Sequence, residues 1–436
     1  MSSSEEEVFF DALEDDPEPR QRRRTSLHPL SNLLAPDKVA CSSASIVSAQ
    51  DRLNYPKPVP IITSKGTRRK GPTSLDGLQL IQELIIDDNQ PVFALAFSRD
   101  GRFLAAGGQD KRIRIWRLLV EEALNERAQI DAEVLHPIPS ELLGHEAEIL
   151  DLSWSRAESL LLLSASMDRT VRLWQPNKSQ CLAIFRHPEI VTCVSFNPRD
   201  DRVFVTGCLD HRVRLWSLEK RQVLAWYELS GTDSIITCLR YSQNSRVVAC
   251  GTSDAQCILF DATSKSGISF HSQFKVCSRR GPRSAGEKIS GIEHVEIGGQ
   301  DYLLVTSNDS RLRMYSMRAG KQICKYVGGF RNTSGSQLCA HMTADFKSIL
   351  MGSEDGTLVI FERGSMGKDE RIEDWAGFKA FSTPITCSII APQEANSLLV
   401  GCGLRSPNPD ATFSSLLIFA ADLGGRIRVW ERPCRN

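Results

Sequence analysis

Two sets of polar side chains have the residue types of acid–base or metal chemistry. Each set holds a histidine, a hydroxyl residue, an aspartate and a tryptophan: His145, Ser164, Asp168 and Trp174 in the first, and His187, Thr206, Asp210 and Trp216 in the second. A histidine beside a carboxylate can act as a general base or bind a metal ion. Neither set contains a second nucleophile, a carboxylate pair or a further metal ligand, so we predict no catalytic residue and no metal site. We interpret both sets as buried networks, in which the aspartate accepts from the imidazole and the indole N–H finds its own acceptor.

The composition of the chain excludes several classes of protein. Lys and Arg together number 53, as do Asp and Glu, so the 436 residues carry no formal net charge and bulk charge does not indicate a nucleic-acid binder. The 13 cysteines are scattered, without a Cys-x-x-Cys pair or histidines at ligand spacing, so we predict no zinc site, disulfide framework or cofactor. The longest apolar runs, 160–163 and 416–421, are far shorter than the ~18 residues of a membrane span. The first residues are acidic where a secretion signal is basic, so we expect the chain on the cytoplasmic, reducing side.

The two polar sets belong to a longer internal repeat. The histidine precedes the aspartate by the same 23 positions in both, 145 to 168 and 187 to 210. Seven segments show alternating apolar residues that end in an aromatic residue: 110–116 (DKRIRIW), 168–174 (DRTVRLW), 210–216 (DHRVRLW), 254–260 (DAQCILF), 309–315 (DSRLRMY), 355–361 (DGTLVIF) and 424–430 (GGRIRVW). The seventh has Gly where the others have Asp. The aromatic residues recur every 42–46 positions, or at longer steps where insertions occur, which is the period of a four-stranded propeller blade.

These repeats resemble the WD-repeat family, whose blades close around a hydrogen-bonded set of Gly-His, Ser or Thr, Asp and Trp. The second blade carries the full set, with Gly144 before its histidine. The resemblance implies an all-β fold, a seven-bladed WD-repeat β-propeller. Other blades depart from the pattern, because Asp88, Thr232, Thr333 and Phe381 take the histidine position in blades one, four, six and seven. We expect those blades to be less tightly bonded.

Composition divides the chain near residue 74. Residues 1–74 hold Ser and Pro runs, an acidic block and two basic clusters at 20–24 and 65–70, with few periodic apolar positions. Such a segment buries too little apolar surface to offset its ordering entropy. We therefore predict a disordered N-terminal tail over 1–74 and the propeller over 75–432.

The ends of the propeller indicate how the ring closes. A lone strand at 78–86 (LQLIQELII) precedes the first blade, and the last strand, 426–431, is the third of its blade. A sheet left one strand short would expose an unpaired edge. We expect residues 78–86 to supply the outer strand of blade seven.

Two insertions lengthen the spacing between repeats. Residues 118–135 place Val120, Leu124 and Ala128 four apart, which predicts a short amphipathic helix that either packs on the propeller or binds a partner. Residues 404–421 lie inside blade seven, contain Pro and Ser, and indicate no chemistry.

A third insertion, residues 264–288, is basic. It offers Arg279, Arg280, Arg283 and Lys288, with a single acid among them. We expect this loop either to meet an acidic partner or anionic lipid headgroups, or to be a solvated charged segment without a partner.

The start of the chain holds two adjacent phenylalanines in an acidic tract, EEEVFFDALEDD at 5–16. Each ring can contribute about 2 kcal/mol when it enters a pocket, and the acids would steer the tract toward a basic surface. The tract resembles the Glu-Phe-Phe-Asp-Ala-x-Glu motif that is bound by VAP proteins, adaptors of the endoplasmic reticulum. The matching residues are Phe9, Phe10, Asp11, Ala12 and Glu14, and Val8 replaces the first Glu. The resemblance implies a VAP-type adaptor as a partner; the alternative is an acidic tail that only aids solubility.

Several blade segments resemble a Rab-GTPase-binding branch of the WD-repeat family, whose members act on recycling endosomes. These segments are 142–155, 166–174, 196–216, 275–295 and 303–318. The resemblance implies a Rab-family small GTPase as a partner. The chain departs from that branch before the propeller, where the family holds its Rab-binding stretch in a long segment with a proline-rich region and this chain has residues 1–74.

Together these resemblances imply a non-enzymatic scaffold that links VAP-type adaptors to endosomal or tubular carriers. We expect a monomeric propeller in the cytoplasm that is recruited peripherally to endosomal and endoplasmic-reticulum membranes. The alternative is a substrate receptor of a cullin-type ubiquitin ligase, but such receptors carry Trp-Asp-x-Arg, and here the closing tryptophans precede Arg117, Gln175 and Ser217. Three arginines before Thr25 and Ser26 match a basophilic kinase pattern, and phosphate there would add negative charge beside the acidic tract.

Overall fold

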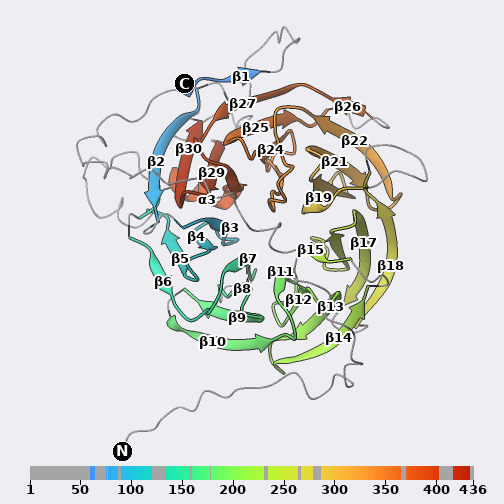
Figure 1. The fold of residues 1–436 in the computed structure, drawn as a ribbon. Helices are drawn as coiled ribbons and strands as arrows, with labels where there is room; N and C mark the ends of the chain where they lie inside the picture. The colour runs from blue at the N-terminus through green and yellow to red at the C-terminus, as the bar shows by residue number, and fades with distance from the viewer. Residues whose placement is uncertain are drawn as a thin grey trace, which may run out of the picture.

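Seven sheets, antiparallel except for one parallel edge strand, stand around a central axis, and Figure 1 looks along that axis. The computed structural model describes residues 59–63, 75, 77–86, 90–119, 134–136, 138–156, 160–176, 178–229, 234–263, 267–277, 286–364, 370–401 and 416–432. Within these ranges each sheet is one blade of a β-propeller, which confirms the predicted fold class and the predicted seven blades. No helix in the described ranges has the length and apolar character needed to cross a membrane.

Each blade begins with an inner strand at the axis and ends with an outer strand at the rim. The strands of blades one to four are β3 (Val92–Phe97), β4 (Phe103–Gly108), β5 (Ile113–Arg117) and β6 (Ser140–Leu142); β7 (Ile149–Trp154), β8 (Leu162–Ser166), β9 (Thr170–Gln175) and β10 (Lys178–Arg186); β11 (Val191–Phe196), β12 (Val203–Cys208), β13 (Arg212–Ser217) and β14 (Gln222–Glu228); and β15 (Ile236–Tyr241), β16 (Val247–Thr252), β17 (Gln256–Thr263) and β18 (Gly267–Lys275).

Blades five and six gain a fifth strand, and blade seven contains both ends of the ring. Their strands are β19 (Ile289–Ile297), β20 (Gln300–Ser307), β21 (Arg311–Ser316), β22 (Lys321–Val327) and β26 (Glu370–Ile372); β23 (His341–Met342), β24 (Ser348–Gly352), β25 (Thr357–Glu362), β27 (Trp375–Lys379) and β1 (Ile62–Thr63); and β28 (Ile385–Ile390), β29 (Leu416–Asp422), β30 (Arg426–Arg432) and β2 (Gln79–Ile85). Helix α3 (Gln393–Gly401) follows β28.

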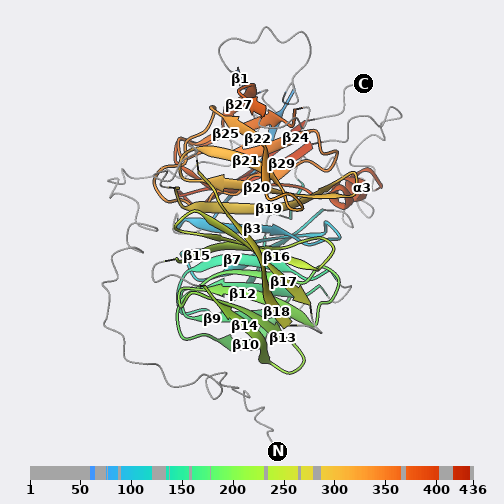
Figure 2. The ribbon, with the colours of Figure 1, turned by 90° about the vertical axis from the view of Figure 1, so that its right-hand side faces the viewer.

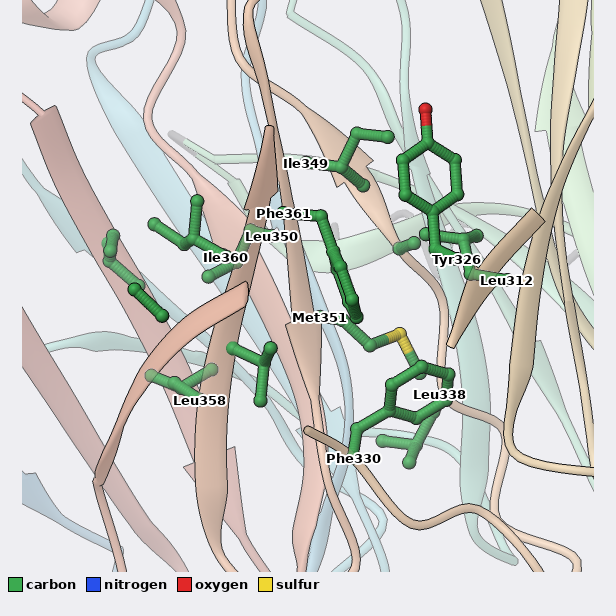
Figure 3. Packing of buried hydrophobic residues seen from close by; sticks show 14 of the residues in the cluster. Leu312, Tyr326, Phe330, Leu338, Ile349, Leu350, Met351, Leu358, Ile360 and Phe361 are labelled. Carbon is green, nitrogen blue, oxygen red and sulfur yellow. The ribbon is translucent and has the colours of Figure 1, made fainter. Parts of the chain in front are cut away.

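The hydrophobic pattern of a strand follows its distance from the axis. Middle strands pack against a neighbouring blade on both faces, so they are buried along their length, and all six residues of β12 are buried, Thr206 among them. Outer strands face solvent on one side, so β14 alternates between exposed and half-buried residues. Figure 3 shows the packing between blades five and six, where the rings of Tyr326 and Phe330 lie 5.5 and 6.0 Å from that of Phe361.

Glycine allows neighbouring blades to approach each other. A β-carbon on Gly207 would lie 2.4 Å from Cγ2 of Ile236, the first residue of the next inner strand. The same relation holds between Gly251 and Ile289, at 2.7 Å. Because close-packed side chains do not approach to such distances, a larger residue at either glycine would push two blades apart.

The ring closes by pairing strands from opposite ends of the chain. β2 lies antiparallel to β30, with Leu80 opposite Trp430 and Glu83 opposite Arg428. Figure 1 shows the blue strand β2 along the outside of the red strand β30. The predicted closure of blade seven is therefore confirmed.

Gln82 of β2 joins this closing strand to blade one. Its Nε2 donates to Leu135 O at 2.7 Å, and its Oε1 accepts from Leu135 N at 2.9 Å. Leu135 also forms a β-bridge with Leu118, so the insertion leaves blade one and returns to it at one point. The helix predicted within 118–135 centres on residues 120–133, which lie outside the described ranges.

Two predicted boundaries are wrong. Ile62 and Thr63, inside the predicted tail, form β1 and pair with β27. Val59 and Ile61 pack against the core beside them, so this part of the predicted tail buries apolar surface, although a two-residue strand is too short to show a period. The predicted insertion at 404–421 also ends early, because β29 occupies its last residues as the second strand of blade seven.

Candidate functional site

The four predicted network residues of blade two lie together in its interior. His145 Nδ1 lies 2.7 Å from Asp168 Oδ2, and His145 Nε2 lies 2.6 Å from Ser164 Oγ. The indole N–H of Trp174 donates to the same Ser164 oxygen at 2.8 Å. Because this oxygen accepts from the indole, its own proton points to Nε2, and Nδ1–H donates to the carboxylate. Every polar atom of the imidazole therefore has a partner.

Blade three repeats half of this arrangement. His187 Nε2 lies 2.9 Å from Thr206 Oγ1, and the indole of Trp216 donates to that oxygen at 3.0 Å. Its Nδ1 lies 3.2 Å from the carbonyl oxygen of Phe185 instead of a carboxylate. The neutral ring with a proton on Nδ1 satisfies both partners.

Asp210, the fourth member predicted for blade three, binds an arginine. Its two carboxylate oxygens accept from Arg214 at 3.0 and 2.5 Å. The expectation that this aspartate accepts from the imidazole is wrong, because the guanidinium four positions further along reaches it with two parallel hydrogen bonds. The same pairing recurs in blades one and five, as Asp110 with Arg114 and Asp309 with Arg313.

Burial determines what these groups can do chemically. The side chains of His145 and Asp168 are 0% and 6% exposed. Burial lowers the pKa of His187 to about 3, with the charge of Arg214 acting in the same direction, and burial also lowers the pKa of His145. Burial would raise the pKa of Asp168, but hydrogen bonds from His145 and Thr170 hold it well below its usual range. Neutral, buried rings whose nitrogens are engaged hold the blade together and are closed to a substrate.

Blades six and seven fill the histidine position in different ways. Thr333 donates its backbone N–H to Glu354 Oε2 at 2.9 Å, so a surface carboxylate fixes this loop. Phe381 packs edge-on against Trp430, with ring centres 5.8 Å apart. Asp88 and Thr232 of blades one and four lie outside the described residues.

An ion pair crosses the inner strand of blade three. Arg240 of blade four binds Asp151 of blade two through two contacts, Nη1 to Oδ2 at 2.9 Å and Nη2 to Oδ1 at 3.2 Å. Asp151 Oδ2 also accepts from the backbone N–H of Val194, in the strand between them, at 3.0 Å. Burial would lower the pKa of Arg240, but Asp151 raises it well above its ordinary value. No repeat pattern indicated this pair, whose members are 89 positions apart.

Hydroxyl side chains tie neighbouring inner strands together. Each donates to the backbone carbonyl of the next blade: Thr192 to Ile236 at 2.8 Å, Thr237 to Ile289 at 2.6 Å and Ser290 to Leu338 at 2.9 Å. These bonds run around the axis from blade three to blade six. The inner ring is therefore bonded across blades as well as within them.

Lys288 does not belong to the surface of the predicted basic loop. Its side chain is buried, and Nζ donates to the carbonyl oxygen of Gly335 at 2.8 Å. Burial lowers its pKa to about 8. This expectation is wrong because Lys288 directly precedes the inner strand β19, which carries it into the interior. Arg279, Arg280 and Arg283 lie outside the described residues.

The acidic tail motif also lies outside the described residues. Its members are Phe9, Phe10, Asp11, Ala12 and Glu14. The motif therefore stays a prediction. Among the described residues, no group of three or more His, Cys, Asp or Glu side chains is arranged to hold a metal ion.

Four segments of the chain match a family model described as "WD domain, G-beta repeat". They are residues 79–117, 137–175, 179–217 and 226–261. Each segment starts near or within the outer strand of one blade and ends at or next to the third strand of the next blade. The sequence repeat is thus offset from the sheet by one strand, which is the offset that lets β2 close blade seven.

Two of three similar proteins carry the same repeat in their names. The chain is 34% identical over 391 residues to "WD repeat-containing protein 44" of Xenopus laevis, covering 79% of this chain and 42% of that protein. It is 30% identical over 290 residues to an uncharacterized WD repeat-containing protein of Schizosaccharomyces pombe, covering 62% and 47%. It is 30% identical over 227 residues to "2-deoxy-glucose resistant protein 2" of Saccharomyces cerevisiae, covering 49% and 26%. The chain spans less than half the length of each of these relatives.

Proposed function

The chain belongs to the WD-repeat propeller family, and from this premise we propose that it is a non-enzymatic scaffold in membrane trafficking. In this proposal the acidic Phe-Phe tract binds a VAP-type adaptor of the endoplasmic reticulum, while the propeller recognises endosomal or tubular recycling carriers. The protein would work in the cytoplasm and be recruited peripherally to both membranes.

The family and the fold support the scaffold role. WD-repeat propellers offer loops and faces around a rigid ring, and function resides in those surfaces. The residues that had the types of acid–base chemistry, His145, Asp168 and His187, are buried in blade hydrogen bonds. The single observation that carries the trafficking proposal is the tract EEEVFFDALEDD, joined to a propeller that is 34% identical to WD repeat-containing protein 44.

The chemistry of the tract supports a specific docking mode. Two adjacent rings each contribute about 2 kcal/mol when they enter pockets. The acids on both sides raise the rate of encounter with a basic surface and make binding sensitive to salt. We propose a Rab-family small GTPase as a second partner, and binding of a GTP-loaded Rab protein to the full chain tests this.

A pull-down with a purified VAP adaptor domain tests the tail assignment. We expect the double variant Phe9→Ala with Phe10→Ala to lose binding by at least about a hundredfold, because both rings are removed. Val8→Glu restores the acid that the motif has at this position and is expected to strengthen binding. Both variants should keep the melting temperature of the wild-type propeller.

The matched control is the single variant Leu13→Ala, since the motif leaves position 13 free. Binding that is equal for wild type, the Phe9 and Phe10 variant and Val8→Glu would refute the assignment. Equal loss in the Leu13 control would show that general hydrophobicity, and not the motif, is responsible.

A further inference from the structure

One face of the propeller carries the hairpins that follow the inner strands. We call it the hairpin face; it presents Arg99, Arg156, Arg199 and Phe346, from blades one, two, three and six. Because every blade begins at the axis in the same direction, these hairpins all emerge on the same side. Helix α3 follows the inner strand of blade seven, and Figure 2 shows it standing out on one face of the disc.

Three arginines, one from each of blades one to three, lie on the hairpin face. The backbone N–H of Arg156 donates to Asp201 Oδ1 at 3.1 Å, and its guanidinium donates to Gln243 of blade four. Arg199 lies two residues before Asp201, so it shares this junction. The pKa of Arg156 is lowered, first by burial and then by the positive charge of Arg99, with Arg199 acting in the same direction.

Contact with α3 fixes the hairpin that carries Arg99. A β-carbon on Gly101 would lie 2.3 Å from the backbone nitrogen of Ala395 in the first turn of the helix. Glu394 of that turn supplies one opposing charge, which acts on Arg156 together with Asp201. Contacts with α3 and with neighbouring blades therefore already fix the hairpins that carry Arg99 and Arg156.

The remaining described acids of the hairpins that carry Arg99 and Arg199 are engaged in turns. Asp100 accepts from Ser98 Oγ at 2.6 Å and from the backbone of Arg102 at 3.1 Å. Asp200 binds the guanidinium of Arg202 at 2.8 Å. In the described ranges the guanidinium groups of Arg99 and Arg199 are exposed and have no hydrogen-bond or ion-pair partner. Clustered like charges repel one another, so this arrangement favours a ligand that supplies several negative charges.

An exposed aromatic ring stands on the same face. Phe346 is 39% exposed at the tip of the hairpin between β23 and β24, where its backbone has φ of 56°. Its hairpin is fixed by Thr343 and Asp345, whose side chains bond to each other at 2.6 Å. A rigid aromatic tip on the same face as exposed arginines is typical of surfaces that rest on lipid, where the ring enters the interface and the cations remain at headgroup level.

We propose that the hairpin face docks on a membrane leaflet that carries phosphorylated inositol lipids, with Arg99, Arg156 and Arg199 on the headgroup phosphates and Phe346 in the interface. Planar guanidinium groups bind phosphate oxygens through paired hydrogen bonds, which favours phosphate over a single carboxylate. This inference extends the proposed scaffold by giving the propeller its own contact with a carrier membrane. It does not depend on the tail motif.

Sedimentation of the full chain with vesicles tests this proposal. The vesicles are phosphatidylcholine alone, phosphatidylcholine with phosphatidylserine, and phosphatidylcholine with a phosphatidylinositol phosphate. We expect the strongest binding to the third. Arg99→Ala with Arg199→Ala should weaken it about twenty-five-fold, because each basic residue near an anionic surface changes partitioning about fivefold.

The matched control removes two charges from the opposite face, Lys111→Ala with Arg169→Ala, and is expected to bind as the wild type does. The basic clusters at 20–24 and 65–70 are present in every variant, so the difference between the two double variants reports on the hairpin face alone. Phe346→Ala should weaken binding to vesicles and leave binding of a soluble inositol phosphate unchanged.

Four outcomes overturn the proposal. Three are absence of wild-type binding to all vesicles, equal binding by the two double variants, and binding of the soluble inositol phosphate without any vesicle binding. The fourth is displacement of the vesicles by an acidic peptide, which would assign the face to a protein partner. No VAP adaptor is present in this experiment, so failure of the tail assignment does not affect its result.

Discussion

At the scale of single residues, Ser164 and Thr206 show how one hydroxyl satisfies the hydrogen bonding of two buried side chains. Each oxygen accepts from an indole N–H and lies within hydrogen-bond distance of a histidine Nε2. The hydroxyl can serve both because it is donor and acceptor at once. Each histidine is held as the neutral tautomer, and this makes the stability of the blades depend on pH.

We predict that the propeller loses stability as the pH falls below about 6.5. The folded pKa of His187 is about 3 against an ordinary 6.5, so the unfolded chain binds more protons in that interval and acid favours unfolding. The loss from this one group should reach about 2 kcal/mol near pH 5. The depressed pKa values of His145 and Asp168 act with the same sign, the carboxylate only below about pH 4.

Urea unfolding at a series of pH values measures this slope. His187→Gln keeps an amide group beside Thr206 and does not titrate, so the slope between about pH 6.5 and 5 should become flatter. An identical slope in wild type and His187→Gln would contradict the role given to burial.

The sequence predicted which residues lie together in these networks better than it predicted their hydrogen-bond partners. Blades two and three both carry an aspartate 23 positions after the histidine and an arginine four positions after the aspartate. Asp168 nevertheless binds His145, and Asp210 binds Arg214. In blade two the Nε of Arg172 is left buried without a hydrogen-bond partner. Equal spacing permits both pairings, so side-chain packing decides between them.

At the scale of elements, strand β2 does more than close a sheet. Its ladder with β30 was predictable from an apolar strand before the first blade and a final blade one strand short. The side-chain contacts of Gln82 with Leu135 were not predictable, because they join segments 53 positions apart through an insertion. Strands β1 and β26 were missed for a different reason, since two or three residues cannot establish a hydrophobic period.

We predict that Gln82→Leu destabilises the propeller by about 3 kcal/mol. The substitution leaves the buried N–H and C=O of Leu135 without their side-chain partner, and each unsatisfied group costs about 1–3 kcal/mol. Chemical denaturation measures the change. Gln79→Leu in the same strand is the control and should shift stability by less than about 0.5 kcal/mol. A loss of the same size in both variants would show that strand packing, and not the amide, is responsible.

At the scale of the whole molecule, polar contacts around the axis couple each blade to others in the ring. The hydroxyl bonds run from each inner strand to the next, and the ion pair of Arg240 with Asp151 spans blade three. The number of blades followed from the repeat period. These cross-blade contacts did not, because the period of the repeat does not indicate which group of another blade a side chain bonds to.

We predict a coupling of about 1–2 kcal/mol between Arg240 and Asp151. The pair is bidentate, but the arginine side chain is 38% exposed, so solvent screens part of the attraction. A double-mutant cycle with Arg240→Met and Asp151→Asn measures this energy, and the asparagine keeps an acceptor for the N–H of Val194. Additive effects within about 0.3–0.5 kcal/mol would mean that the pair does not couple the blades.

The pairing of β2 with β30 can form only late in the synthesis of the chain. Glu83 and Arg428, which bind each other across that pair, are separated by 345 positions, so a ribosome adding about 5–20 residues per second takes roughly 20–70 s to deliver the second after the first. During that interval β2 lacks the strand to which it hydrogen-bonds in the finished propeller. A premature stop codon anywhere before Arg426 prolongs the wait indefinitely, and the shortened product is then a natural target for chaperones and proteases.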